Sequence, residues 1–181
     1  MDKRKIMLIL VLIIGVALFI WIQFFEVPNK VRIGEEKMQQ DPLTHDFEKA
    51  TSFKNPYMGD ASNLAQLLNA LPLNNYRGTI ELKPEQHLLI VEYDPDENVT
   101  EETIKQMVVY NSTAAFTLIG NLRKVNFLIG NESYTVTREN VDKWFGTTLV
   151  DFKDPAIFKE KVQDNLTKDI DQWVIAYTEG E

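Results

Sequence analysis

The chain has 181 residues, no cysteine and a formal net charge of −8 at pH 7. The lack of cysteine excludes disulfides and thiolate chemistry. The acidic balance argues against nucleic acid as a partner, because a phosphate backbone repels an acidic surface.

The chain starts with a basic segment, Lys3–Lys5, which runs directly into an uncharged apolar stretch, Ile6–Phe25. At 1.5 Å per residue this stretch forms a helix of about 30 Å, the thickness of the hydrocarbon core of a bilayer. It is longer than the apolar core of a cleaved signal peptide, and its exit, Trp21–Pro28, is too bulky for a cleavage site. The sequence therefore predicts a transmembrane signal anchor that holds the protein in the membrane through Ile6–Phe25.

The charges that flank the anchor predict its orientation. Three basic residues precede the apolar stretch, whereas Glu26 and Lys30 follow it. The positive-inside rule then places the N-terminus in the cytoplasm and the C-terminal part outside the cell membrane. That exported part holds 16 basic and 26 acidic residues, so we expect an acidic extracytoplasmic domain on a single-pass anchor.

The remaining sequence divides into a linker and one domain. Residues 26–52 are rich in Lys, Glu and Gln and show little periodicity, which is typical of a linker, although Leu43–Phe47 could pack on the domain. The rest is long enough for one small core and not for two. The predicted organisation is a cytoplasmic tail at 1–5, the anchor at 6–25, the linker at 26–52 and an extracytoplasmic α+β domain at 53–181.

The first half of the domain predicts a helix followed by a β-hairpin. Ala61–Leu71 carries an apolar stripe at helical spacing, with Asp60 as its N-cap; Gly59, just before the cap, permits a tight turn. Gly78–Lys83 and His87–Tyr93 predict two strands around a short turn.

An acidic loop, Asp94–Thr100, separates this hairpin from a second long helix over Thr100–Asn121. The loop begins like a calcium-binding loop, but Val99 and Lys105 stand where glycine and glutamate are required. We therefore interpret it as a solvated loop that caps the following helix.

A second hairpin, Val125–Thr137, turns at Gly130-Asn131, and Thr137 caps a short helix that ends before Gly146. Asp154 and Pro155 open the last helix. Its inward seam is expected to contain Phe158, Val162, Leu166, Ile170, Trp173 and Tyr177, although Trp173–Tyr177 could instead form a strand.

This helix–hairpin–helix–hairpin–helix order predicts an α+β fold, an antiparallel four-stranded sheet with helices on one face. Asp60, Gly59, Thr137 and Gly146 are the predicted structural residues of its turns and caps.

Asn111 lies on the apolar face of the second helix. We interpret it as a structural core amide that bonds a nearby backbone group, for example in the segment before the first helix, since buried amides usually pair within the protein. In the alternative interpretation, a groove between helix and sheet binds a small ligand or peptide, with Tyr57, Tyr76, Tyr93 and Asn111 as candidate wall residues.

Catalytic and metal-binding patterns are missing from the sequence. The four serines lack a nucleophile motif, no phosphate-binding glycine loop is present, and His45 and His87 are separated along the chain. A metal-assisted hydrolase would require these two histidines to meet. We expect no catalytic residues, no metal site and no cofactor.

Four stretches carry a resemblance to a known family: Tyr57–Leu73, Val109–Asn121, Val125–Arg138 and Trp144–Gly146. They resemble an uncharacterised extracytoplasmic domain family of Gram-positive, Bacillus-type bacteria, over residues 47–158. Members of that family are also attached to anti-sigma-like and membrane sensor-peptidase segments, which implies envelope sensing rather than catalysis. The function expected from the sequence is a membrane-anchored interaction or sensor domain of the cell envelope, with an envelope protein as its partner.

Overall fold

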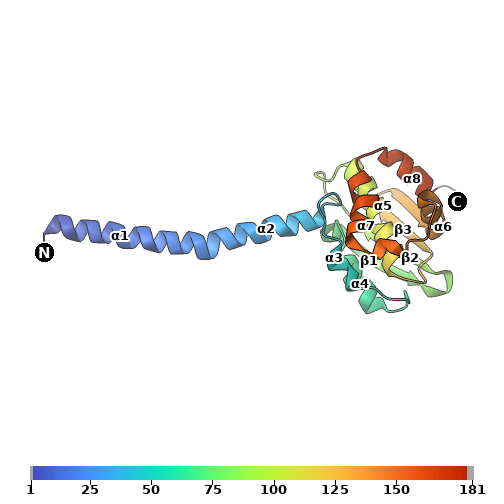
Figure 1. The fold of residues 1–181 in the computed structure, drawn as a ribbon, viewed down its shortest axis with the longest axis horizontal. Helices are drawn as coiled ribbons and strands as arrows, with labels where there is room; N and C mark the ends of the chain where they lie inside the picture. Colours follow the sequence, from blue (N-terminus) through green and yellow to red (C-terminus); the bar gives the residue numbers. More distant parts are fainter. Residues whose placement is uncertain (1, 179–181) are drawn as a thin grey trace. The chain divides into compact units, whose positions relative to one another are not determined.

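A computed structural model describes residues 2–178 of the chain. The chain divides into two compact units, Met1–Met38 and Gln39–Glu181. Figure 1 labels the α-helices of both and strands β1–β3.

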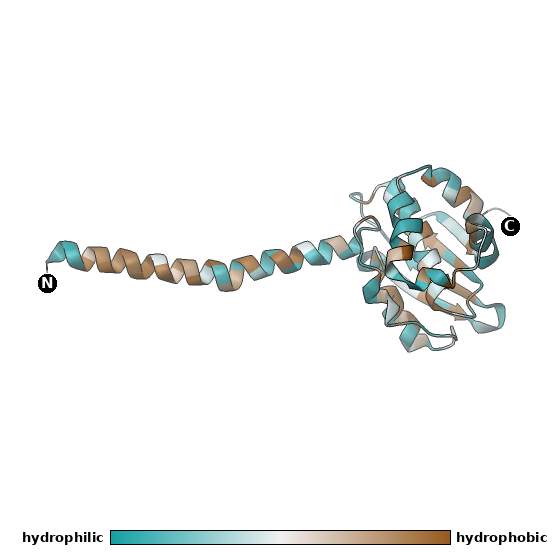
Figure 2. Ribbon diagram, viewed as in Figure 1, coloured by the Kyte–Doolittle hydropathy of each residue, from teal (hydrophilic) through white to brown (hydrophobic). Residues whose placement is uncertain are grey.

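The first unit is helical from Lys3 onward. Helix α1 spans Lys3–Trp21, a π-helical turn covers Ile22–Glu26, and α2 continues over Val27–Gln40. Figure 2 shows the apolar residues concentrated in α1. By length and composition this helix could cross a membrane, as predicted for Ile6–Phe25.

The π-helical turn lies next to Pro28, where an α-helix would be strained. Proline has no N–H, and its ring clashes with the carbonyl group four residues earlier, that of Phe24. The Val27 N–H bonds the Ile22 oxygen five residues back, and this wider turn provides room at that carbonyl. The helix therefore continues into α2, over residues that the sequence assigns to a linker.

The second unit, called the compact unit from here on, begins at Gln39, ahead of the predicted boundary at residue 53. Residues 41–52 contain the short helix α3 (Glu48–Thr51) and bury His45, Phe47 and Ala50. The Phe47 ring stacks on that of Phe158 with 3.8 Å between centroids. Phe47 and Ala50 make this segment part of the core, whereas Leu43 is 37% exposed.

The sheet contains four strands in the order β1-β2-β3-β4: Arg77–Lys83, Leu88–Tyr93, Lys124–Ile129 and Glu132–Thr137. The two outer pairs are antiparallel, but β2 and β3 pair in parallel, so the sheet is mixed and the prediction of a fully antiparallel sheet was wrong. The reason is α5 (Glu101–Leu118), which joins β2 to β3 as a crossover. It returns the chain to the end of the sheet at which β2 begins, so β3 runs in the same direction as β2.

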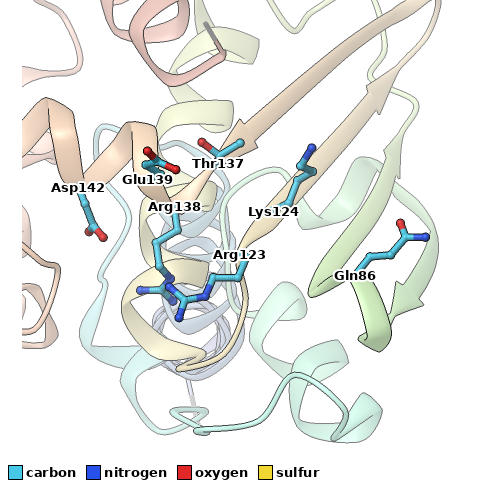
Figure 3. Close-up of a pocket in the computed structure, with 7 residues that line it drawn as sticks. All are labelled: Gln86, Arg123, Lys124, Thr137, Arg138, Glu139 and Asp142. Carbon is cyan, nitrogen blue, oxygen red and sulfur yellow. The ribbon is translucent and has the colours of Figure 1, made fainter. Parts of the chain in front are cut away.

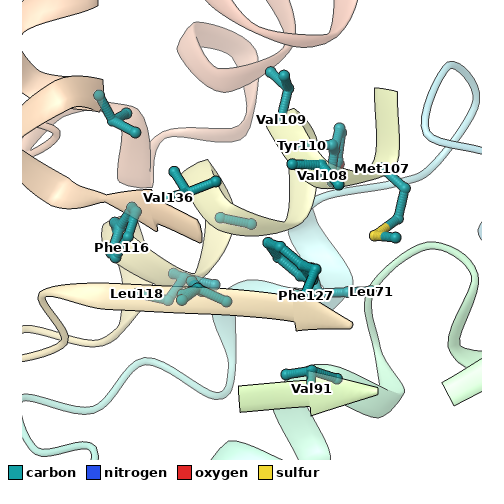
Figure 4. Packing of buried hydrophobic residues seen from close by; sticks show 14 of the residues in the cluster. Leu71, Val91, Met107, Val108, Val109, Tyr110, Phe116, Leu118, Phe127 and Val136 are labelled. Carbon is teal, nitrogen blue, oxygen red and sulfur yellow. The ribbon is translucent and has the colours of Figure 1, made fainter. Parts of the chain in front are cut away.

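Helix α5 is the centre of the domain. In β2 and β3, buried residues alternate with more exposed ones, so one face of each strand points into the core. Every residue of α5 from Gln106 to Leu118 is buried, which an amphipathic helix with one apolar face would not be. A second layer of helices covers it, and Figure 4 shows part of this core.

Two contacts mark that second layer. Tyr110 meets the ring of Phe158 at 5.0 Å between centroids, and the Thr113 hydroxyl bonds the Tyr177 hydroxyl at 2.9 Å. Phe158 belongs to α7 (Pro155–Lys161) and Tyr177 to α8 (Ile170–Thr178).

The local start and stop signals form as predicted. Asp60 caps α4 (Ala61–Asn69) by accepting the Asn63 N–H, and Thr137 caps α6 (Arg138–Phe145) by accepting that of Asn140. Gly146 ends α6 in the left-handed conformation, at φ 66°.

The last predicted helix is two helices, α7 and α8. The chain turns between them through Gln163–Asn165, where the Gln163 amide donates to the carbonyl oxygens of Pro42 and His45. Trp173–Tyr177 is helical, which settles the alternative that the sequence left open.

Candidate functional site

Two pockets of about 490 and 240 Å³ share Arg123, Arg138 and Asp142 in their walls. We call the hollow that they form the basic groove. The larger pocket is also lined by Gln86, Lys124, Thr137 and Glu139, and the smaller one by Phe116, Thr117, Gly120, Thr148, Leu149, Val150 and Lys153.

Arg138 closes the C-terminal end of α5. Its Nε donates to the Leu122 oxygen at 2.8 Å, and its Nη2 donates to the oxygens of Phe116 at 2.6 Å and Ile119 at 2.7 Å. These carbonyl groups lack helical partners, and the cation also suits the negative end of the helix dipole. The Nη1 group makes no hydrogen bond with any described residue, so two N–H donors of Arg138 are left for a ligand.

Arg123 is held next to Arg138 by the backbone. The Arg138 N–H donates to the Arg123 oxygen at 2.8 Å, and the Arg123 N–H donates to the oxygen of His87 at 3.0 Å. The Arg123 side chain is exposed and forms no hydrogen bond or ion pair within the described part of the chain. Figure 3 shows its guanidinium close to that of Arg138. Neither guanidinium forms a salt bridge with a carboxylate of the described residues, although Asp142 is near enough to interact with both, and such a pair of cations can bind an anion.

Two buried oxygen atoms of the groove have no partner. Thr117 is 3% exposed, and its Oγ1 makes no hydrogen bond. The Oδ1 of Asp142 is buried without a partner as well. Burial raises the pKa of the Asp142 carboxyl, while Arg138, Arg123 and a backbone bond from Leu149 lower it. An unpartnered buried polar atom costs free energy, so a ligand that reached these atoms would recover it.

The groove differs in charge from the rest of the domain. Its walls hold four basic residues, Arg123, Lys124, Arg138 and Lys153, and two acidic ones, Glu139 and Asp142. The whole chain has a net charge of −8. The groove is therefore suited to a small anion that also carries a hydrogen-bond donor.

The structure separates the four candidate wall residues of the helix–sheet groove. Tyr57 is 68% exposed, and Tyr76 is half-buried with its hydroxyl on Asp96. Tyr93 and Asn111 are buried in the core and lie together, with the Asn111 amide 3.4 Å from the Tyr93 hydroxyl. Burial raises the pKa of Tyr93 to about 12, so its hydroxyl is neutral at pH 7.

Asn111 ties α5 to the turn after α4. Its Nδ2 donates to the Pro72 oxygen at 3.0 Å, while its Oδ1 is buried without a partner. The expected partner before the first helix is therefore replaced by one after it. The reason is that the turn after α4 brings the Pro72 oxygen within hydrogen-bond distance of the Asn111 amide.

Both ring nitrogens of His45 are used inside the core. Its Nε2–H donates to the Ala70 oxygen at 2.7 Å, and its Nδ1 accepts from the Tyr110 hydroxyl at 2.7 Å. His87 lies between β1 and β2 with a left-handed backbone, at φ 49°. Among residues 2–178, no group of three His, Asp or Glu side chains is placed to hold a metal ion.

The basic groove was not predicted from the sequence. Arg138 carried a signal: it is the first residue of a helix, where the dipole disfavours a cation. A basic residue at such a position is explained only by the fold, which places the end of α5 beside it.

The comparisons with known proteins concern the middle of the chain. Residues 51–139 match the model of a family described as a domain of unknown function, DUF4825. The matched segment contains Thr117, Arg123 and Arg138 of the groove but ends before Asp142. No curated protein and no solved structure matches the chain.

Proposed function

We propose that the chain is a single-pass membrane protein whose compact unit is a non-catalytic interaction or sensor domain on the extracytoplasmic side. The observation that supports this proposal is the division into an apolar helix of membrane-spanning length and a separate compact unit. The basic residues at Lys3–Lys5 favour a cytoplasmic N-terminus.

The proposed setting is the cell envelope of a Gram-positive bacterium, with an envelope protein as partner. The lack of cysteine and the resemblance over residues 47–158 support it. A binding role rather than catalysis is favoured by the walls of the basic groove, which contain arginines and carboxylates but no nucleophile paired with a base.

Protease treatment of intact protoplasts tests the topology. The compact unit should be digested, and a small membrane-embedded N-terminal fragment should remain. A compact unit that resists protease until the cells are lysed would place it in the cytoplasm. A soluble mature protein that begins near Val27–Lys30 would show that the apolar run is a cleaved signal.

Site-specific photo-crosslinking in cells tests the interaction role. A photoreactive amino acid is placed at Val150, which lines the groove and is 61% exposed, and in a control at Ile175, which is 53% exposed on α8. We expect a reproducible adduct from position 150 and not from position 175. Equal adducts, or none from either position, would count against a partner at the groove.

A small-ligand or peptide-binding module is the second candidate. Because Tyr93 and Asn111 lie within the packed core, we place its binding surface at the basic groove instead of between helix and sheet.

A further inference from the structure

We propose that the basic groove binds an α-carboxylate whose neighbouring carbon carries an N–H donor, as at the C-terminus of a peptide or in a free amino acid. The inference rests on the second candidate function, since it names the ligand of that surface. It does not depend on which side of the membrane the domain occupies.

The two arginines would bind the carboxylate of the ligand. Arg138 uses Nε and Nη2 to close α5, and this structural role leaves Nη1 without a partner. The backbone holds Arg123 beside Arg138, and its exposed guanidinium has no ion pair among residues 2–178, so that group is left to bind a ligand. A planar carboxylate can accept from both side chains at once.

Two buried oxygen atoms would form further hydrogen bonds with the ligand. Thr117 is only 3% exposed, and its hydroxyl, which has no hydrogen-bond partner, lies in the wall of the smaller pocket. A hydroxyl can donate to a carboxylate oxygen. The unpartnered Oδ1 of Asp142 requires the opposite, a donor, which an amide or ammonium N–H of the ligand would provide.

The rest of the lining limits the size and type of ligand. The smaller pocket, at about 240 Å³, lies below the usual range for drug-sized ligands, so it fits one terminal residue. Phe116, Leu149 and Val150 offer an apolar wall for the side chain of that residue. Glu139 and Asp142 disfavour a phosphate dianion, which also lacks the N–H donor.

The test is an NMR titration of the full chain in detergent micelles with four probes. They are acetyl-Ala-Val with a free carboxylate, the same peptide as its C-terminal amide, free valine, and inorganic phosphate. We expect the free-carboxylate peptide to shift the amide signals of residues 116–123 and 138–153. The C-terminal amide should bind about tenfold more weakly, because it lacks the charge that the arginines recognise.

The four probes separate the sources of the ligand. Valine that binds as tightly as the peptide would identify a free amino acid as the source, and much weaker binding of valine would identify a peptide end. Both results support the shared chemistry. Equal binding of the C-terminal amide or of phosphate, or no saturable shift with any probe at millimolar concentration, would overturn the proposal.

Three variants locate the site. Arg123→Gln and Thr117→Val should each weaken binding of the peptide about tenfold. Thr117→Val keeps the shape of the side chain and removes a hydroxyl without a partner, so the variant should fold like the parent. Lys143→Gln, which removes a charge from the exposed side of the same helix as Asp142, is the matched control and should bind like the parent. Binding that is unchanged in the first two variants, or lost equally in all three, would refute the groove as the site.

Discussion

His45 is buried as a neutral imidazole, and acid should therefore destabilise the fold through it. The residue is 3% exposed, and its Nε2–H donates to Ala70 while its Nδ1 accepts from Tyr110. Burial lowers the pKa of His45 below the ordinary value of 6.5. Below pH 6.5 the unfolded chain then binds a proton that the native chain excludes, so stability falls as the pH falls toward the native pKa.

The size of the effect follows from proton linkage. Each pH unit in which only the unfolded histidine is protonated costs about 1.4 kcal/mol of unfolding free energy. Between pH 7 and pH 5 the loss through His45 therefore reaches at most about 2 kcal/mol. The raised pKa of Asp142 acts in the opposite direction, because the native chain is the one that binds that proton.

Urea unfolding of residues 39–181 at pH 5, 6 and 7, followed by circular dichroism, measures this loss. His45→Gln serves as the comparison: its side chain offers an amide N–H to Ala70 and an oxygen to Tyr110, but it does not titrate. Whatever its stability at pH 7, the variant should lose less stability on acidification than the parent. Since Asp142 is the same in both chains, its contribution cancels. Equal losses in the parent and the variant would refute the assignment of a buried neutral His45.

Four further changes test other parts of the fold by thermal or urea unfolding of residues 39–181. Asn111→Ala should cost about 1–3 kcal/mol, because the Pro72 oxygen loses its donor; a variant as stable as the parent would contradict a structural role. Asp60→Ala should cost about 0.5–2 kcal/mol through loss of the α4 cap, with exposed Lys143→Gln as a neutral control. Gly146→Ala should cost about 1–2 kcal/mol, since alanine is strained at φ 66°. A chain that starts at residue 53 loses buried Phe47 and should be at least about 3 kcal/mol less stable than one that starts at Gln39; equal melting temperatures would show that residues 39–52 are dispensable.

Much of the fold could be predicted where a signal is local. The caps Asp60 and Thr137 and the left-handed Gly146 depend on a few neighbouring residues, and each forms the predicted contact or conformation. The two hairpins likewise follow from alternation and turn residues. These features need no knowledge of distant parts of the chain.

The parallel pairing of β2 with β3 could not be predicted in the same way. A helix between two hairpins is compatible with either direction of the central pair, and only the packing of α5 across the sheet decides. The packing of residues 41–52, the last part of the predicted linker, on the domain depends on distant partners in the same way. His45 and Phe47 find their partners at Tyr110 and Phe158, more than sixty residues away.

The candidate site could be predicted from the sequence less well than the fold. Arg123, Arg138 and Asp142 form no sequence motif and meet only because the end of α5, the start of β3 and helix α6 converge. Thr117 is one of several threonines in the chain, and its missing partner is a property of its surroundings rather than of its residue type.

The burial of α5 on every side has a consequence for how the protein can be made. Asn111-Ser112-Thr113 is an acceptor sequence for N-linked glycosylation, yet Asn111 is 1% exposed in the folded chain. In a eukaryotic secretory host the sugar is attached while the chain is still unfolded, and an oligosaccharide at this position could not enter the core. The sequence is thus compatible with folding in a bacterial host, whereas secretion from mammalian or yeast cells would first require removal of this acceptor sequence.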